Sequence, residues 1–147
     1  MSKVKALFHI VFCTKARKMT LPRAYLEELN CFITKIVKDS GSRLIRVGGI
    51  ENHVHLLIDL HPSVSLSALV RDVKSLSSVW MKTDARFCLF EGWATEYYAC
   101  ALSPAHKDAV IEYIKGQREH HSGVRFDDEL KKLHTEADVV YDERNMR

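Results

Sequence analysis

An alternating run in the middle of the chain constrains the fold more than any other feature. Residues 53–60 read His-Val-His-Leu-Leu-Ile-Asp-Leu. In an extended strand, residues two apart lie on the same face. His53 and His55 therefore project together, while Val54 and the apolar residues after it project into a core. Two imidazoles on a rigid strand provide half of a divalent-metal site, although a histidine pair on a sheet surface is an equal alternative at this point.

The bulk properties describe an ordinary globular domain. The chain has 147 residues, of which 46% are hydrophobic and 28% charged, and a net charge of +3, so we expect a single domain over residues 1–147. No apolar run reaches the ~18 residues that span a bilayer, so no membrane partner is expected. The four cysteines show no CxxC pair, which favours reduced thiols in a cytoplasmic protein. The charge permits an anionic partner without demanding one.

The order of predicted elements is β-α-β-β-α-β-α. It indicates an α+β, ferredoxin-like antiparallel sheet with helices on one face, plus an added C-terminal helix. Residues 124–147 are expected to be a C-terminal extension of the same domain. The predicted strands cover 6–13, 43–47, 53–60 and 93–101, and the helices 22–40, 65–83, 104–122 and a short one near 127–134. Gly48-Gly49 suggests a bend or bulge. The apolar stripe expected on the second helix is Leu66, Leu69, Val70, Val73, Leu76 and Trp80.

The helix predicted over 104–122 places a tyrosine beside an amide. Tyr113 and Gln117 are four residues apart and so lie on one face. Gly116 lies between them, and a mid-helix glycine costs about 1 kcal/mol relative to alanine. Its presence there suggests a close backbone approach or a need for pliability. A lone tyrosine or glutamine at such positions is usually a solvated helix residue.

The combination of a His-hydrophobic-His strand with Tyr-Ile-x-x-Gln some 60 residues later resembles the single-tyrosine HUH transposases. These are the small insertion-sequence enzymes of the IS-two-hundred type, also called transposase-like tyrosine nucleases. The similarity extends over most of the chain. It is carried by Phe8-His9-Ile10-Val11-Phe12-Cys13-Thr14-Lys15, Asn52-His53-Val54-His55-Leu56-Leu57, Ser65-Leu66-Ser67-x-Leu69-Val70, Lys74-x-x-Ser77-Ser78-x-Trp80, Tyr113-Ile114-x-x-Gln117-x-x-His120-His121 and Phe126-x-x-Glu129.

The resemblance implies a role for each matching residue. His53, His55 and Gln117 would hold Mg²⁺ or Mn²⁺, and Tyr113 would be the nucleophile. Two imidazoles and an amide leave positions open for phosphate oxygens, as Lewis-acid catalysis requires. The resemblance also implies single-stranded DNA with hairpins as substrate, a 5′-phosphotyrosine intermediate, and an obligate homodimer whose active sites are shared between subunits. Such a protein would act in the cytoplasm of a bacterial or archaeal cell, associated with the nucleoid.

Basic and hydroxyl side chains are candidates for binding the DNA backbone. One group lies in the loop after the first strand and the other on the polar face of the second helix, and a solvated face is the alternative for the latter. The candidates are Lys15, Arg17, Lys18, Arg71, Lys74, Ser75, Ser78 and Lys82. Adjacent helical residues cannot join one metal site, so His120 and His121 are expected at a helix end or near phosphate.

Two departures from the family pattern keep other functions open. The family usually has Asp where this chain has Asn52, which removes a carboxylate next to the first histidine, and Glu51 is a possible substitute. A family segment Gly-Tyr-Gly-Ala-Phe-Ser-Val-Ser corresponds here to residues 96–103, which contain no glycine. One alternative is therefore a non-catalytic or domesticated protein that binds DNA hairpins. Another is a transposase acting on repetitive extragenic palindromes.

Overall fold

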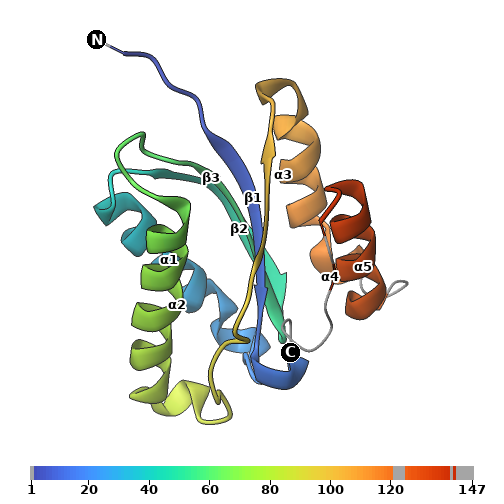
Figure 1. The fold of residues 1–147 in the computed structure, drawn as a ribbon. Coiled ribbons are helices and arrows are strands. Elements are labelled where there is room, and N and C mark those ends of the chain that lie inside the picture. The colour runs from blue at the N-terminus through green and yellow to red at the C-terminus, as the bar shows by residue number, and fades with distance from the viewer. Residues whose placement is uncertain (1, 121–124, 140, 142–147) are drawn as a thin grey trace.

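The computed structural model describes residues 2–120, 125–139 and 141. Within them, antiparallel strands form one sheet in the order β2-β3-β1-β4, which confirms the predicted ferredoxin-like arrangement (Figure 1). The strands are β1 (Leu7–Cys13), β2 (Arg43–Ile50), β3 (His53–Asp59) and β4 (Tyr98–Leu102). The helices are α1 (Leu26–Asp39), α2 (Leu66–Lys82), α3 (Lys107–Lys115), α4 (Gln117–His120) and α5 (Phe126–Glu136). No helix in these described ranges is long and apolar enough to cross a membrane.

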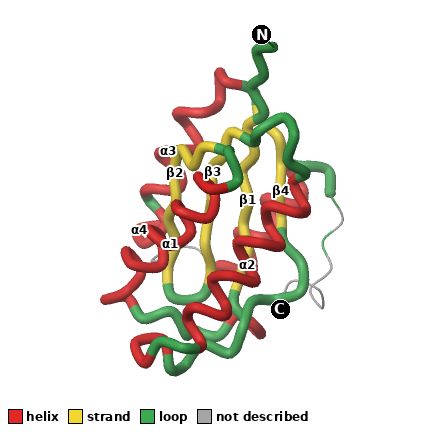
Figure 2. The backbone as a smooth tube through the Cα atoms, turned by 90° about the vertical axis from the view of Figure 1, so that its left-hand side faces the viewer, coloured by secondary structure: helices red, strands yellow, loops and turns green. Residues whose placement is uncertain are grey.

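Helices cover both faces of the sheet. The α1–α2 pair packs on one face, seen from the front in Figure 2, and α3, α4 and α5 lie on the other side in Figure 1. Alternation along the strands divides the side chains between the two layers. On β1, Ile10 and Phe12 join the core under α1 and α2, whereas Val11 and Cys13 join a smaller cluster with Phe126 of α5. The added C-terminal helices therefore enclose the face toward which the histidines of β3 project.

The helix predicted over residues 104–122 is interrupted. A short 3₁₀ turn precedes α3, and α3 ends at Lys115, with Gly116 as its C-cap before α4 begins at Gln117. The predicted end of this helix near Ser122 falls outside the described residues. A Cβ atom on Gly116 would lie no closer than 3.5 Å to a neighbouring atom, so this glycine marks a helix end and not a close approach.

The close approach occurs instead at Gly48 and Gly49. A Cβ atom on Gly48 would stand 2.9 Å from Ile114 Cγ2, and one on Gly49 would stand 2.2 Å from the His53 carbonyl oxygen. Both glycines lie inside a continuous β2, and the register shift of that strand falls between Leu44 and Arg46. The expected bulge at Gly48-Gly49 is therefore wrong. These two residues let α3 and β3 come close to β2.

The buried face of α2 and the start of β4 also differ from the sequence-based expectation. In α2, Leu76 is 51% exposed, while Ser77 and Met81 are fully buried. The buried face is thus rotated from the expected stripe, because Ser77 accepts a hydrogen bond from Trp93 Nε1 at 3.0 Å and so satisfies its hydroxyl inside the core. β4 begins at Tyr98, and the preceding segment from Trp93 contributes a single bridge to Thr14.

Candidate functional site

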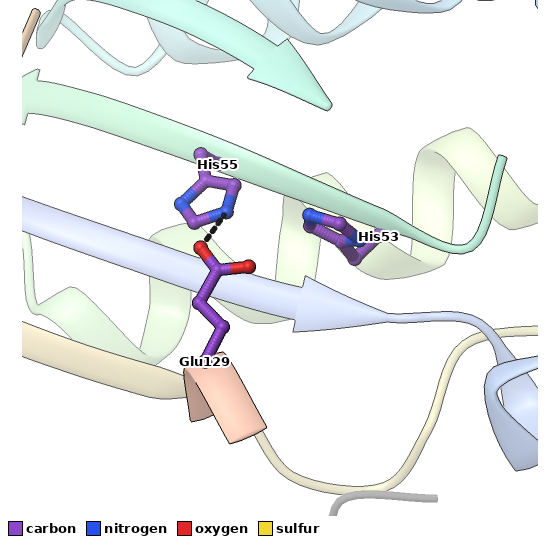
Figure 3. Close-up of side chains that lie close together, drawn as sticks. All are labelled: His53, His55 and Glu129. Carbon is purple, nitrogen blue, oxygen red and sulfur yellow. Dashed lines mark ion pairs between the residues drawn. The ribbon is translucent and has the colours of Figure 1, made fainter. Parts of the chain in front are cut away.

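The two histidines of β3 meet a carboxylate from α5. One ligand atom from each of His53, His55 and Glu129 lies within 4.8 Å of the others, and all three residues are buried. Figure 3 shows both imidazoles projecting from β3 toward the Glu129 side chain. His55 Nε2 lies 3.4 Å from Glu129 Oε1. Residues about 75 positions apart in sequence thus form one buried polar cluster on the sheet face under α3 and α5.

His53 lies between two oxygen atoms that can only accept hydrogen bonds. Its Nδ1 is 2.8 Å from Asn52 Oδ1, and its Nε2 is 2.9 Å from Gln117 Oε1. The amide orientations are fixed from the other side, because Asn52 Nδ2 donates to the Arg17 carbonyl oxygen and Gln117 Nε2 donates to Glu129 Oε1. A neutral imidazole has a single N–H and can donate to only one of the two oxygens.

A divalent cation would resolve this arrangement. With the proton on Nδ1 facing Asn52, the lone pairs of His53 Nε2 and Gln117 Oε1 face each other at 2.9 Å with no proton between them. His53 Nε2 and Gln117 Oε1 are close enough that both would serve as ligands of one divalent cation, and the cation would satisfy both lone pairs. The alternative is an imidazolium, which is costly in a side chain that is 0% exposed. The donors fit a divalent cation held by two imidazoles, an amide oxygen and a carboxylate.

Tyr113 lies at the same cluster. Its hydroxyl donates a hydrogen bond to Glu129 Oε1, and its ring packs edge-on against His55, with ring centroids 5.6 Å apart. Burial, reinforced by the hydrogen bond to Glu129, raises the pKa of Tyr113 above its usual range. The phenol is therefore protonated at neutral pH, and a carboxylate lies next to its proton. His120 packs against the other side of the ring, at 5.5 Å between centroids. His121 lies outside the described residues.

His9 extends the cluster along β1. Its Nε2 is 2.8 Å from His55 Nδ1, and the two rings are stacked with centroids 5.1 Å apart. Burial, followed by the neighbouring His55, lowers the pKa of His9 to about 3, so that this ring is neutral. His9 and Glu129 belong to the segments that resemble the family, but the sequence alone assigns neither of them a role. Each lies far in sequence from the histidine strand, and only the pairing of β1 with β3 and the packing of α5 bring them to it.

Asn52, which stands where the family usually has Asp, and Glu51, the candidate substitute for that carboxylate, have different partners in the structure. Asn52 accepts from His53 through its amide oxygen, so it provides the hydrogen bond that a carboxylate oxygen would provide. Glu51 is directed elsewhere, because its carboxylate binds Arg118 Nη2 of α4 at 2.6 Å. Glu51 therefore does not substitute for a carboxylate at the histidines, and it instead ties the β2–β3 turn to the segment that carries Gln117.

The proposed DNA-binding residues of α2 line a groove across the sheet from this cluster. Arg71, Lys74, Ser75 and Ser78 share a groove of about 440 Å³ with aromatic residues of the segment before β4. Lys74 Nζ donates to the carbonyl oxygens of Ala94 and Thr95, so this lysine also fixes the groove wall. Lys82, at the end of α2, is exposed and does not line the groove.

The three basic residues in the loop after β1 differ in burial. Lys15 and Lys18 are exposed, and Lys18 forms an ion pair with Glu91 at 3.1 Å. Arg17 is buried, where its guanidinium pairs with Asp127 at the start of α5 and donates to the Tyr141 hydroxyl. Arg17 is therefore not grouped with the exposed lysines. It anchors α5, the helix that positions Glu129.

A ferredoxin-like sheet with a histidine pair on one strand and a tyrosine on a covering helix is the combination found in a class of small transposases. Comparison with known proteins places the chain in that class. The chain belongs to the IS200-like transposase family, because the family model described as "Transposase IS200 like" matches residues 2–117. The transposase for insertion sequence element IS200 of Salmonella typhimurium (strain LT2) is 23% identical over 117 residues, which cover 76% of each chain.

Two further similarities come from a second curated relative and a solved structure. The ISDra2 transposase TnpA of Deinococcus radiodurans is also 23% identical over 117 residues, which cover 76% of this chain and 84% of that one. The structure of a REP-associated tyrosine transposase bound to a REP hairpin matches with a TM-score of 0.62 and 16% identity. The similarity covers 100% of this chain and 98% of the chain in that structure. At 16% identity it supports the fold alone.

Proposed function

We propose that this chain nicks and rejoins single-stranded DNA at hairpin-marked insertion-sequence ends, with Tyr113 as nucleophile. One observation carries the proposal. The hydroxyl of Tyr113 and the ligand atoms of His53, His55, Gln117 and Glu129 converge on one buried position. A general DNA-binding domain has no need for a phenol hydrogen-bonded to a carboxylate beside a metal-ligand set.

The chain's own residues account for the proton that the reaction must move. Because the raised pKa of Tyr113 keeps the phenol protonated, its proton must leave as the oxygen attacks the phosphorus. Glu129 Oε1 already accepts that hydrogen bond and is the base. The Tyr113 oxygen forms a bond to the phosphorus and the bond from phosphorus to the 3′ oxygen breaks. The departing 3′ oxygen takes up the proton that Glu129 received, which leaves a free 3′-OH. Attack of a 3′-OH on this phosphotyrosine reverses the step and rejoins DNA without ATP.

His53, His55, Gln117 and Glu129 would hold Mg²⁺ or Mn²⁺. When bound, the ion polarises the scissile phosphodiester and neutralises developing charge. The single carboxylate among the donors suits a hard cation, and His53 and His55 contribute neutral nitrogens. His53 is held by Asn52, so the absence of the family's Asp at this position does not leave the ligand unsupported.

The groove on α2 is the proposed contact for the DNA backbone, together with Lys15 and Lys18. Such contacts give affinity that depends on salt and not on base sequence. We expect Arg71→Ala to weaken binding to all hairpins about equally and to lower the slope of log K against log salt by about 1. Lys132→Ala is the matched control, because Lys132 is an exposed lysine on α5, on the opposite face of the sheet.

A transposase acting on repetitive extragenic palindromes is the second candidate, and one observation favours it: the solved structure of a REP-associated tyrosine transposase bound to a REP hairpin is similar in fold over 100% of this chain. The predicted homodimer with shared sites remains a prediction. Analytical ultracentrifugation at micromolar concentration tests the homodimer, and a monomer would contradict it. The covalent-adduct assay below separates the two candidates when it is run with oligonucleotides from insertion-sequence ends and from repetitive extragenic palindromes.

A covalent-adduct assay tests the catalytic proposal. Single-stranded oligonucleotides covering palindromes near the gene are labelled at the 3′ end and incubated with Mn²⁺. The wild type is expected to form a denaturation-resistant protein–DNA adduct, and Tyr113→Phe none. Tyr25→Phe is the matched control, because Tyr25 packs against Phe87 on the α1–α2 side. His53→Ala should abolish the adduct and retain most hairpin binding.

The same assay distinguishes catalysis from binding. Hairpin binding by the wild type with no adduct on any oligonucleotide would support a non-catalytic or domesticated protein. An adduct that survives in Tyr113→Phe would refute the nucleophile assignment. With a 5′ label, the proposal predicts a shorter free product that ends in a 3′-OH.

A further inference from the structure

His9 and His55 share one proton at their contact. The two residues are diagonal neighbours on adjacent strands, since His9 pairs with Leu57 and His55 with Val11. His9 Nε2 and His55 Nδ1 are 2.8 Å apart, and both residues are buried, His9 at 6% exposure and His55 at 0%. At this distance one nitrogen donates and the other accepts. Two arrangements of the shared proton satisfy this contact, one with the proton on His55 Nδ1 and one with the proton on His9 Nε2.

These two states differ in what His55 offers to a metal ion. If His55 Nδ1 carries the proton and donates to His9, then His55 Nε2 keeps a lone pair. If His9 Nε2 carries the proton and donates to His55, then the single proton of His55 sits on Nε2, the atom that lies 3.4 Å from Glu129 Oε1. The first state can bind a cation through Nε2 and the second cannot.

We propose that His9 is a positioning residue that holds His55 in its metal-binding tautomer by accepting the proton of Nδ1. The inference rests on the proposed metal site at His53 and His55. It assigns to His9 what Asn52 does for His53, because each neighbour contacts an Nδ1 atom, at 2.8 Å in both cases, and leaves Nε2 to the cation. Partners of this kind fix ring orientation and tautomer, and their loss costs about 10–100-fold in metal affinity.

The stacking of the two rings allows a test that preserves packing. His9→Phe keeps an aromatic ring parallel to His55, where the interplanar angle is 16°, but removes the acceptor. His9→Gln restores an oxygen that can accept from Nδ1. His134→Phe is the matched control, because His134 is also buried, at 4% exposure, and contacts Leu130, Tyr98 and Tyr141 outside the proposed metal site.

The measurement is Mn²⁺ affinity by electron paramagnetic resonance, without DNA. We expect His9→Phe to weaken Mn²⁺ binding by about 10–100-fold, His9→Gln to remain within a few-fold of the wild type, and His134→Phe to match the wild type. Wild-type affinity in His9→Phe would overturn the proposal, as would an equal loss in His9→Gln or in His134→Phe. If the wild type bound no Mn²⁺, the metal site itself would be refuted and this assignment with it.

A spectroscopic readout covers the case in which His9→Phe does not fold. Long-range ¹H–¹⁵N correlation spectra of the Mg²⁺-saturated wild type report which nitrogen of each histidine carries a proton. The proposal predicts a proton on His55 Nδ1 and none on His9 Nε2. A proton on His9 Nε2 in that state would overturn it, whatever the activity of the protein.

Discussion

Gly48 is the position at which a single methyl group should disturb both the fold and the proposed chemistry. It lies on β2 directly opposite His55 of β3, and α3 rests against it. A Cβ atom there would stand 2.9 Å from Ile114 Cγ2 and 3.0 Å from the Ile114 carbonyl oxygen. Ile114 is 1% exposed and adjoins Tyr113. Gly48→Ala therefore pushes on the helix that carries Tyr113, the proposed nucleophile.

The expected size of the effect follows from these distances. Non-bonded carbon atoms approach to about 3.5–4.0 Å, so α3 must withdraw by about half an ångström. The Ile114 methyl can turn aside, but its carbonyl belongs to the helix backbone and cannot. Overpacking of this kind costs about 1–3 kcal/mol in the free energy of unfolding. A misplacement of 1 Å at a reacting group can cost ~10²-fold in rate, so a shift half as large should slow adduct formation about tenfold.

Gly116→Ala provides the matched control. It makes the same chemical change on the same helix, at a backbone φ of −85° that alanine adopts, and its new Cβ meets only ordinary contacts. It should leave stability unchanged or raise it by up to about 1 kcal/mol. Urea unfolding gives the stabilities, and the covalent-adduct assay gives the rates. If Gly48→Ala equalled the wild type in both, or if Gly116→Ala lost as much, the reasoning about close packing at Gly48 would be refuted.

Three further perturbations test other parts of the site. The pKa of His9 is lowered to about 3 in the native state. Below pH 6.5 the unfolded chain therefore binds a proton that the native ring does not bind. The free energy of unfolding is highest above pH 6.5 and decreases as the pH is lowered from there toward 3. The decrease in the free energy of unfolding amounts to about 2 kcal/mol at pH 5. Urea titrations of His9→Phe at several pH values should lack this contribution to the pH dependence. Arg17→Met should cost about 1–3 kcal/mol and speed amide exchange in α5, since it removes the partner of Asp127; unchanged exchange would contradict the anchoring role. Glu129→Gln should slow adduct formation about 10²–10⁴-fold, with Glu136→Gln as control, and a rate near wild type would exclude Glu129 as the base.

Local patterns in the sequence predict the sheet and most of its helices because these depend on near neighbours. Strict alternation places His53 and His55 on one face, and both lie there. The errors arise where long-range packing outweighs a local pattern. Ser77 replaces Leu76 in the buried face of α2 because the Trp93 indole reaches its hydroxyl from a distant segment. Nothing in the spacing of α2 itself signals that partner.

The site divides in the same way. The i, i+4 relation of Tyr113 and Gln117 is a local property, and both residues lie at the histidines. The part played by Glu129 depends on α5 folding back over the sheet, which the Arg17–Asp127 pair helps to fix. The part played by His9 depends on strand register. The family motif includes both residues, but a motif names positions and does not say which atoms will meet.

The hydrogen bonds around the histidines also bear on whether the chain has a functional catalytic site or is a non-catalytic DNA-hairpin-binding protein. A non-catalytic hairpin-binding protein would need the α2 groove and no more, and buried polar groups without a task are costly to retain. Here His53 is held by Asn52, His55 contacts His9, and Tyr113 donates to Glu129. The change from Asp to Asn at position 52 keeps the acceptor that the ring requires. The glycine-free segment before α3 is likewise accommodated, since Tyr98 is only 5% exposed and pairs with Val11. Both departures fall at positions where the contact that matters is preserved, which favours a working site over a decayed one.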